Sequence, residues 1–433
     1  MSKRITAWDR FFWILAIVTF VVGFYGIYVR ATTGHTQANY GSYVPWGLWV
    51  AGYIYMVGLS AGAFLFSTLI YVFNIRRLGG VGTVAAPAVG LPAGAEFGRE
   101  KLEQVGKLAL FTALVTLCGA VVCIWLDLGR PERVWKLMFQ TSFRSIMGWM
   151  IWFYAAYFVL LLVELWLAMR ADLVAWSIKN ALMRFLTFGR RDVSEATLAG
   201  DRRLLRILGS LGVLLAIAFH GSVGAIFGVI AARPYWNSAL TPILFLVGAL
   251  LSGGALLTFI NAIWGPEPGT ESHSNLMRFL GQIVLALLAL DVLLEWAEFS
   301  ISLWNGTPVE TASLRLVLFG PYWWAFWIIH MGLGVVVPGL LLMFVRHKTW
   351  AVATAGVLIA TTFLAVRLNI VIPGLAVSEI HGLEQAFSGP GLSLNYFPSV
   401  TEWLVFVWQI GLAALIFLIG RRLLPLVTTE KGT

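Results

Sequence analysis

Ten apolar segments, each long enough to cross a bilayer as a helix, make up most of this chain. A helix needs about 20 mainly apolar residues to span the hydrocarbon core of a membrane. The expected spans are residues 11–29, 46–74, 104–128, 145–170, 203–232, 238–265, 275–303, 322–346, 349–373 and 399–424. Because lipid offers no hydrogen-bond partners to the backbone, such segments must be helical. The sequence therefore predicts an all-α integral membrane protein with about ten transmembrane helices.

The composition excludes a soluble globular protein. Hydrophobic residues make up 59% of the 433 residues and charged residues 12%, which is too few to cover a soluble domain of this size. A net charge of +9 would suggest nucleic acid binding in a soluble protein. Here the usual excess of Lys and Arg on the cytoplasmic side explains it, so we expect no nucleic acid partner.

The distribution of Lys and Arg predicts that both termini are cytoplasmic. Most of the 30 Lys and Arg residues precede the first span, follow the last span, or fall in the loops 75–103 and 171–202 and the shorter loops on that same side. Cytoplasmic loops of membrane proteins carry this excess. The first apolar run, residues 11–28, is longer than the roughly 7–15 residues of a secretory signal, so we expect it to remain as the first helix.

A weak internal repeat predicts two related four-helix bundles. Residues 57–63 resemble residues 247–255, and both stretches lie in spans that run from outside to inside. The expected units are 1–45 (first flanking helix and outer loop), 46–237 (first bundle), 238–398 (second bundle) and 399–433 (last flanking helix and tail). Small residues also allow close packing of helices, and that alone would produce the same similarity.

Two acidic residues near the ends of spans have both a structural and a functional interpretation. An ionisable side chain in hydrocarbon is costly, which makes each one a functional candidate. Asp127 closes the third span and either pairs with Arg130 or Arg133 or contributes to a site at the outer face. Glu164 lies near the cytoplasmic end of the fourth span, where it either extends to the membrane surface or pairs with Arg170, or else marks an inner entry point for protons.

Three further acids lie on one face of the seventh span. Asp291, Glu295 and Glu298 are spaced i, i+4 and i+7, so their side chains share a helical face. Arg367, at a similar depth in the ninth span, can form an ion pair with one of them but not with all three. Together these residues indicate a proton path or a polar cavity.

The chain offers few ligands for a redox cofactor of its own. Its two cysteines, Cys118 and Cys123, are too few for an iron–sulfur cluster, which takes about four. His220 and His330 lie at comparable depths, but we expect them in different bundles, which does not suit bis-histidine haem b. A single buried histidine such as His220 is either a structural hydrogen-bonding residue or a functional one. We therefore expect neither haem nor an iron–sulfur cluster on this chain.

Several sequence stretches together resemble the NrfD/PsrC family, the membrane subunits of polysulfide-reductase-type complexes. They are Pro45-Trp46-Gly47 through Gly62-Ala63, Leu126-Asp127-Leu128-Gly129-Arg130-Pro131-Glu132-Arg133, His220-Gly221 through Gly228, Arg233-Pro234-Tyr235-Trp236 and Arg367-Leu368-Asn369-Ile370-Val371-Ile372-Pro373-Gly374. Their span covers most of the chain, and the chain is most similar to the longer, ten-helix branch of the family. That branch includes the hydrogenase-2 membrane subunit, DsrP and the membrane subunits of alternative complex III.

The resemblance implies a membrane subunit of a multisubunit oxidoreductase in the cytoplasmic membrane of a prokaryote. Such a subunit exchanges electrons between the quinone pool (menaquinone or ubiquinone) and a ferredoxin-like iron–sulfur subunit on the outer face. A further catalytic or cytochrome subunit is expected in the complex. Carried over to this sequence, His220 and Asp127 are the expected quinone-binding and proton-exchanging residues, with Arg130, Tyr53 and Trp46 as lining residues.

Two other functional classes share some of these features. A secondary transporter also carries intramembrane acids, but it more naturally shows an inverted repeat and helices broken at the midplane, neither of which the sequence displays. A membrane cytochrome with haem b is the other alternative, for which the sequence offers only the His220 and His330 pair.

The orientation is tested by fusing a topology reporter after Thr433. We expect a cytoplasmic reporter such as green fluorescent protein to be active in this fusion, and a periplasmic phosphatase to be inactive. The opposite result would invert the predicted topology and move every outer residue to the inner face.

Overall fold

The computed structural model describes residues 6–72, 99–178, 180–306, 308–380 and 382–427. Within these ranges ten helices are long and apolar enough to cross a membrane. They are α1 (Ala7–Thr33), α2 (Leu48–Tyr71), α4 (Arg99–Asp127), α6 (Ile146–Ser177), α8 (Glu195–Gly228), α9 (Thr241–Trp264), α10 (Glu271–Asn305), η3 (Ala325–Val336) continued by α12 (Val337–Phe344), α13 (Thr349–Leu375) and α15 (Val400–Leu423). The predicted all-α, multi-pass fold is thereby confirmed, whereas the cytoplasmic location of the termini stays a prediction.

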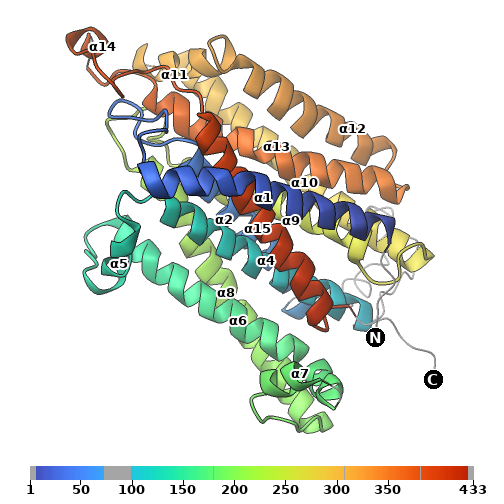
Figure 1. The fold of residues 1–433 in the computed structure, drawn as a ribbon. Helices are drawn as coiled ribbons and strands as arrows, with labels where there is room; N and C mark the ends of the chain where they lie inside the picture. The colour runs from blue at the N-terminus through green and yellow to red at the C-terminus, as the bar shows by residue number, and fades with distance from the viewer. Residues whose placement is uncertain (1–5, 73–98, 179, 307, 381, 428–433) are drawn as a thin grey trace.

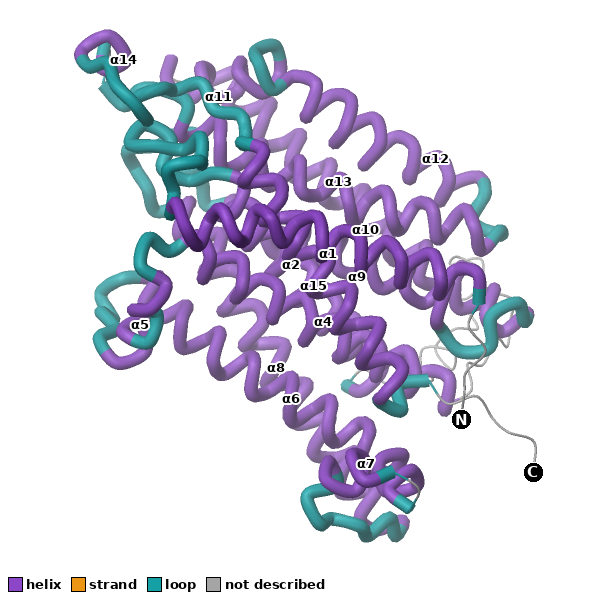
Figure 2. Tube along the Cα trace, in the orientation of Figure 1, coloured by secondary structure: helices purple, strands orange, loops and turns teal. Residues whose placement is uncertain are grey.

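Short helices cap the two ends of the bundle (Figure 1). Figure 2 shows the loops gathered at these ends and helices between them. The short elements are η2 (Pro131–Arg133), α5 (Lys136–Phe139), α7 (Ala181–Leu186), α11 (Pro308–Leu318) and α14 (Leu383–Ala386). Helices α5, α11 and α14 lie at one end, and α7 lies at the other, where α1 begins and α15 ends. In the predicted orientation the α7 end is cytoplasmic.

Helices α2 and α9 pack directly against each other at the centre of the protein. A Cβ atom placed on Gly62 would lie 2.0 Å from the carbonyl oxygen of Ala249, and one on Gly253 would lie 2.6 Å from Cα of Gly62. Only glycine permits so close an approach of two backbones. The two repeated stretches therefore meet each other at this crossing. Close packing explains their small residues, and the division into two bundles stays a prediction.

The remaining helices surround this central pair. Helix α2 also packs on α4, and α9 packs on α8, α10 and α13. Helices α6 and α8 pair with each other, as do α1 and α15, and α15 lies against α4. At the α7 end, Asp9 of α1 forms a buried ion pair with Arg421 of α15 and accepts a 2.9 Å hydrogen bond from the indole of Trp264 in α9. These contacts join both flanking helices to the core.

Two stretches that carry the family resemblance interlock at the opposite end. Pro373, inside α13, has no N–H to donate to the carbonyl of Asn369 one turn earlier. That carbonyl accepts instead from the hydroxyl of Tyr235, at 3.0 Å. The indole of Trp236 donates to the next carbonyl, that of Ile370, at 2.7 Å. These bonds fix the segment after α8 to α13, at the turn where the proline leaves a backbone carbonyl without its usual helical donor.

The eighth span begins as a π-helix, which the sequence analysis did not anticipate. Pro338 cannot donate to Gly334, and its ring would collide with that carbonyl in a regular α-helix. Widening by one residue relieves the conflict, and the N–H of Val337 donates to Gly332, five residues back. His330 lies in this widened segment and contacts α10.

We expect the stabilising effect of the hydrogen bond from Tyr235 to the Asn369 carbonyl to depend on Pro373. In Tyr235→Phe the freed carbonyl loses its partner, and we expect unfolding in detergent to become easier by about 1 kcal/mol. In a Pro373→Ala background the helix supplies an N–H to the same carbonyl, so Tyr235→Phe should cost much less there. Tyr25→Phe, at an exposed position on α1, is the control and should change nothing. An equal cost of Tyr235→Phe in both backgrounds would show that the hydroxyl stabilises the protein in some other way.

Candidate functional site

His220 lies fully buried on α8 with one ring nitrogen engaged and the other without a partner. Its Nε2 is 2.8 Å from the carbonyl oxygen of Phe245 in α9. A carbonyl can only accept, so Nε2 must carry the hydrogen in this contact. In the neutral ring Nδ1 then bears a lone pair, and no described residue donates to it. Nδ1 of His220 can therefore accept a hydrogen bond from a ligand.

Arg367 of α13 reaches the same carbonyl from the other side. Its Nη2 lies 3.4 Å from the Phe245 oxygen, and its guanidinium carbon lies 4.6 Å from the Phe245 ring centre and 5.0 Å from that of Phe363. The side chain is 1% exposed, and its Nε has no partner within the described part of the chain. A buried cation held over aromatic rings, and still short of a hydrogen-bond acceptor, can receive an oxygen atom from a ligand.

Two glycines, on α2 and α9, lie next to His220 and Arg367. A Cβ atom on Gly58 of α2 would lie 3.7 Å from Cε1 of His220 and 3.6 Å from Nη2 of Arg367. A Cβ atom on Gly248 of α9 would lie 3.2 Å from that same Nη2. The polar groups therefore lie where α2, α8, α9 and α13 meet, at the centre of the helix arrangement.

Of the three acids predicted on one face of the seventh span, Asp291 interacts with Arg367. Asp291 is buried on α10 and interacts electrostatically with Arg367, Glu295 and His330. Glu295 accepts a 2.8 Å hydrogen bond from Nε2 of His330, which is thus part of an ion pair when protonated. Glu298, one turn further along the same face, accepts from the hydroxyl of Ser238 at 3.0 Å. A connected line of ionisable groups runs from Arg367 along α10.

Asp127 belongs to a second polar cluster, at the end of α4. Arg30 of α1 donates to the carbonyl oxygens of Leu126 (2.9 Å) and Leu128 (2.7 Å) on either side of it. Arg30 also donates to Nε2 of His35 at 2.7 Å, and Nδ1 of His35 contacts the hydroxyl of Tyr40. Burial, and secondly the charge of Arg30, lower the pKa of His35, while burial raises the pKa of Tyr40.

The side chain of Asp127 does not pair with the arginines that follow it in the sequence. Its carboxylate is attracted by the charge of Arg30 and repelled by that of the buried Glu402 of α15. Arg130 and Arg133 are exposed, and each lies 3.9 Å from Glu132 instead. The reason is local: α4 ends at Asp127, so the spacing of a helix no longer applies beyond it. Arg130, expected to line the site, thus faces outward.

Tyr53 lies in a line of hydroxyl groups between α2 and α6. It accepts a 2.6 Å hydrogen bond from Tyr154 and lies 3.7 Å from the sulfur of Met150. One to two turns deeper, Tyr157 donates to the carbonyl of Ser60 at 3.2 Å. These groups are buried and lie between Asp127's end of the bundle and the opposite, α7 end.

Glu164 continues this line, and its expected pairing with Arg170 is wrong. Arg170 forms an ion pair with Asp201 of α8 at 2.5 Å. The i, i+6 spacing of Glu164 and Arg170 turns their side chains to different faces of α6. Glu164 is 1% exposed, and its Oε1 has no partner among the described residues. Three residues on its own face (i+3, i+4 and i+7) line a cavity of about 600 Å³: Leu167, Ala168 and Ala171.

Trp46 lines a different cavity, of about 370 Å³, at the end where α8 and α13 terminate. Its ring stacks on that of Trp236, with centres 5.9 Å apart, and meets the edge of Phe227 at 5.5 Å. At the rim Arg233 forms a 2.9 Å ion pair with Glu379. The cavity combines aromatic and aliphatic side chains with a charged pair, which suits an apolar ring with polar substituents.

The structure brings some predicted residues together and separates others. His220 and Arg367 share one carbonyl, and Asp291 of α10 interacts with Arg367. Asp127 has none of the contacts that His220 makes. Aromatic rings separate Trp46 from His220. Their roles as site residues stay predictions.

Sequence reasoning missed the residues around Asp127. Arg30 directly follows the expected first span, and Glu402 lies in the last span of the chain. Glu402 accepts hydrogen bonds from the backbone N–H groups of Asn39 (3.0 Å) and Ser399 (2.9 Å) and from the hydroxyl of Tyr396 (2.5 Å). A visible signal was the Ser399-x-x-Glu402 pattern of a helix N-cap, although it gave no hint of the distant partners.

Comparison with known proteins places the chain in a family. The sequence model described as "Polysulphide reductase, NrfD" matches residues 36–379. A selenate reductase subunit of Mesobacillus selenatarsenatis is 34% identical over 97% of this chain and 95% of its own length. The Hdr-like menaquinol oxidoreductase integral membrane subunit of Archaeoglobus fulgidus is 27% identical, covering 96% of this chain and 92% of its own length. The menaquinone reductase integral membrane subunit of Nitratidesulfovibrio vulgaris is 21% identical, over 95% and 90%. The resemblance inferred from the motifs is confirmed, and the chain belongs to the NrfD family of multi-pass membrane proteins.

Proposed function

We propose that this chain is the quinone-reactive membrane subunit of a multisubunit oxidoreductase. It exchanges electrons between the quinone pool and an iron–sulfur subunit bound at the end that carries α5, α11 and α14. The relatives named for menaquinol and menaquinone support a quinone as the substrate class. The observation that carries the proposal is the buried His220, whose Nδ1 has no partner within the described residues, next to a cation that lacks an acceptor.

Quinone chemistry requires this kind of group. Oxidation of a quinol breaks two O–H bonds and releases two protons and two electrons. Nδ1 of His220 accepts the two protons in turn, releasing the first to the α10 acids before the second arrives, while the electrons leave one at a time to the clusters of the partner subunit. In the opposite direction the protonated Nδ1 returns its proton to a quinone oxygen. Arg367, with its Nε free of described partners, supplies a donor for the oxygen when it carries negative charge.

The cavity at Trp46 is the proposed entrance for the quinone ring. Its volume of about 370 Å³ falls within the range of small-molecule sites. Aromatic rings lead from it to His220: Trp46 contacts Phe227, Phe227 contacts Phe245 (5.4 Å between centres), and Phe245 contacts His220 (6.3 Å). The ring of Phe227 lies between the cavity and the histidine, so it must rotate for the quinone to reach Nδ1.

The line of acids on α10 is the proposed route for protons. From Asp291 to Glu298 the side chains change from buried to half-buried, in the direction in which α10 runs toward the predicted outer face. Asp291 is the proposed next acceptor for a proton released by His220, and the Glu295–His330 pair follows it along α10. We propose Asp127, with Arg30, as a second exchange point at the same face. Glu164 and the tyrosine hydroxyls are the corresponding groups toward the α7 end.

The sharpest test is the variant His220→Gln. The introduced amide can still donate to the Phe245 carbonyl, so the complex should assemble, but it cannot take up a proton. We expect quinol-dependent turnover to fall by about 5- to 150-fold, which corresponds to the loss of roughly 1–3 kcal/mol. Electron transfer from a soluble artificial donor to the partner subunit should be unchanged.

His273 offers a matched control. It is also buried, and one ring nitrogen lies 3.0 Å from the carbonyl of Pro266 while the other has no described partner. It lies at the opposite end of the bundle, so His273→Gln should retain quinol turnover. Wild-type turnover in His220→Gln, or an equal loss in both variants, would assign His220 a purely structural role.

A further inference from the structure

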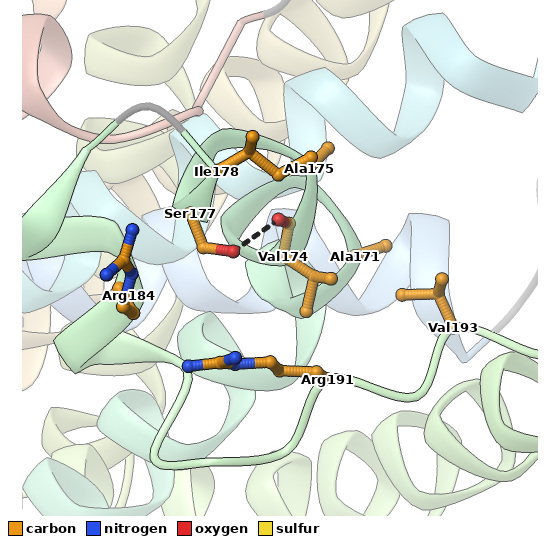
Figure 3. A pocket seen from close by; sticks show the side chains of 8 residues that line it. All are labelled: Ala171, Val174, Ala175, Ser177, Ile178, Arg184, Arg191 and Val193. Carbon is orange, nitrogen blue, oxygen red and sulfur yellow. Dashed lines mark hydrogen bonds between the residues drawn. The ribbon is translucent and has the colours of Figure 1, made fainter.

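The end of α6 carries a cavity that the proposed electron and proton transfer does not use. Helix α6 has 32 residues and is therefore about 48 Å long, whereas the hydrocarbon core of a membrane is about 30 Å thick. The helix is therefore long enough to reach the level of the lipid headgroups at its α7 end. There α6, α7 and the loop after α7 enclose a cavity of about 560 Å³ (Figure 3).

Two arginines from different elements reach this cavity. Arg184 comes from α7 and Arg191 from the loop that follows it (Figure 3). The acids nearby are engaged elsewhere: Asp172 pairs with Lys107, Asp201 pairs with Arg170, and the carboxylate of Asp192 accepts from Ser194 and Thr197. Within the described ranges no carboxylate forms an ion pair with Arg184 or Arg191. The cavity therefore presents two positive charges to an anion from outside the chain.

The rest of the lining is apolar, which restricts the kind of anion. The other lining residues are Ala171, Val174, Ala175, Ser177, Ile178 and Val193, and the hydroxyl of Ser177 is turned to the carbonyl of its own helix at 2.7 Å. Around the cavity Ile178, Phe185 and Phe188 are 78%, 71% and 67% exposed. Large apolar side chains exposed beside arginines are typical of segments that lie in the membrane interface.

We propose that this cavity binds an anionic phospholipid. The phosphate lies between the guanidinium groups of Arg184 and Arg191, and an acyl chain runs along Val174 and Ile178. A free inorganic anion would use the arginines but not the apolar wall. A zwitterionic lipid would use the wall but gain less from two positive charges. The inference is independent of the proposed quinone chemistry.

Native mass spectrometry of the full chain, with any subunits that copurify, tests this site. The delipidated protein is titrated with phosphatidylglycerol or with phosphatidylcholine of the same acyl chains. We expect the first phosphatidylglycerol to bind more tightly than phosphatidylcholine. Each of Arg184→Ala and Arg191→Ala should weaken it by about fivefold, since one basic residue near an anionic surface contributes about 1 kcal/mol.

Arg190→Ala is the matched control, because Arg190 is exposed beside Arg191 but does not line the cavity. It should leave the affinity for phosphatidylglycerol unchanged, and an excess of inorganic phosphate should not displace the lipid. Equal binding of the two lipids would overturn the proposal, as would equal losses in all three variants. Displacement by phosphate would show instead that the site takes a free anion.

Discussion

A polar group that a spanning helix buries must find its hydrogen-bond partner inside the protein, because hydrocarbon offers none. This constraint accounts for the main long-range contacts. The carbonyl that Pro373 leaves free is taken by Tyr235, and Arg30 donates to the last carbonyls of α4. Such bonds join segments that are far apart in sequence, and they hold the end of the bundle where the candidate site lies.

Buried polar groups without a partner among the described residues are therefore candidates for binding a ligand. Among the described residues, Nδ1 of His220 and Nε of Arg367 are two of several buried side-chain atoms without a hydrogen-bond partner, and these two belong to side chains that meet at one carbonyl. Leaving buried polar atoms unpaired is costly unless a ligand completes them. Gly248 leaves room for the Arg367 guanidinium, because a Cβ atom there would lie 3.2 Å from Nη2. The arrangement suits a substrate whose oxygen alternates between carbonyl and hydroxyl.

The sequence predicted the spans well and the polar contacts poorly. Apolarity over about 20 residues follows directly from membrane thickness, so the ten helices could be found without any knowledge of packing. The α10 face was also predictable, because i, i+4 and i+7 spacing is a local property.

The surroundings of Asp127 and Glu164 could not be predicted in this way. Their neighbours in sequence were candidate partners, but α4 ends at Asp127, and Arg170 turns away from Glu164. Their surroundings depend on α1, α2 and α15, which no local pattern identifies. The π-helix before Pro338 likewise results from a steric conflict rather than from a hydropathy signal.

The central claim is that the quinone reaches His220 from the cavity at Trp46. The most direct measurement is photo-cross-linking of the complex with an azido-quinone, followed by mapping of the labelled peptides. The account predicts labelling in α2 near Trp46 and in α8 between His220 and Phe227, with excess unlabelled quinol suppressing it. Labelling that competes with quinol but falls only on α10 and η3 would contradict the account and move the site to the other side of α9.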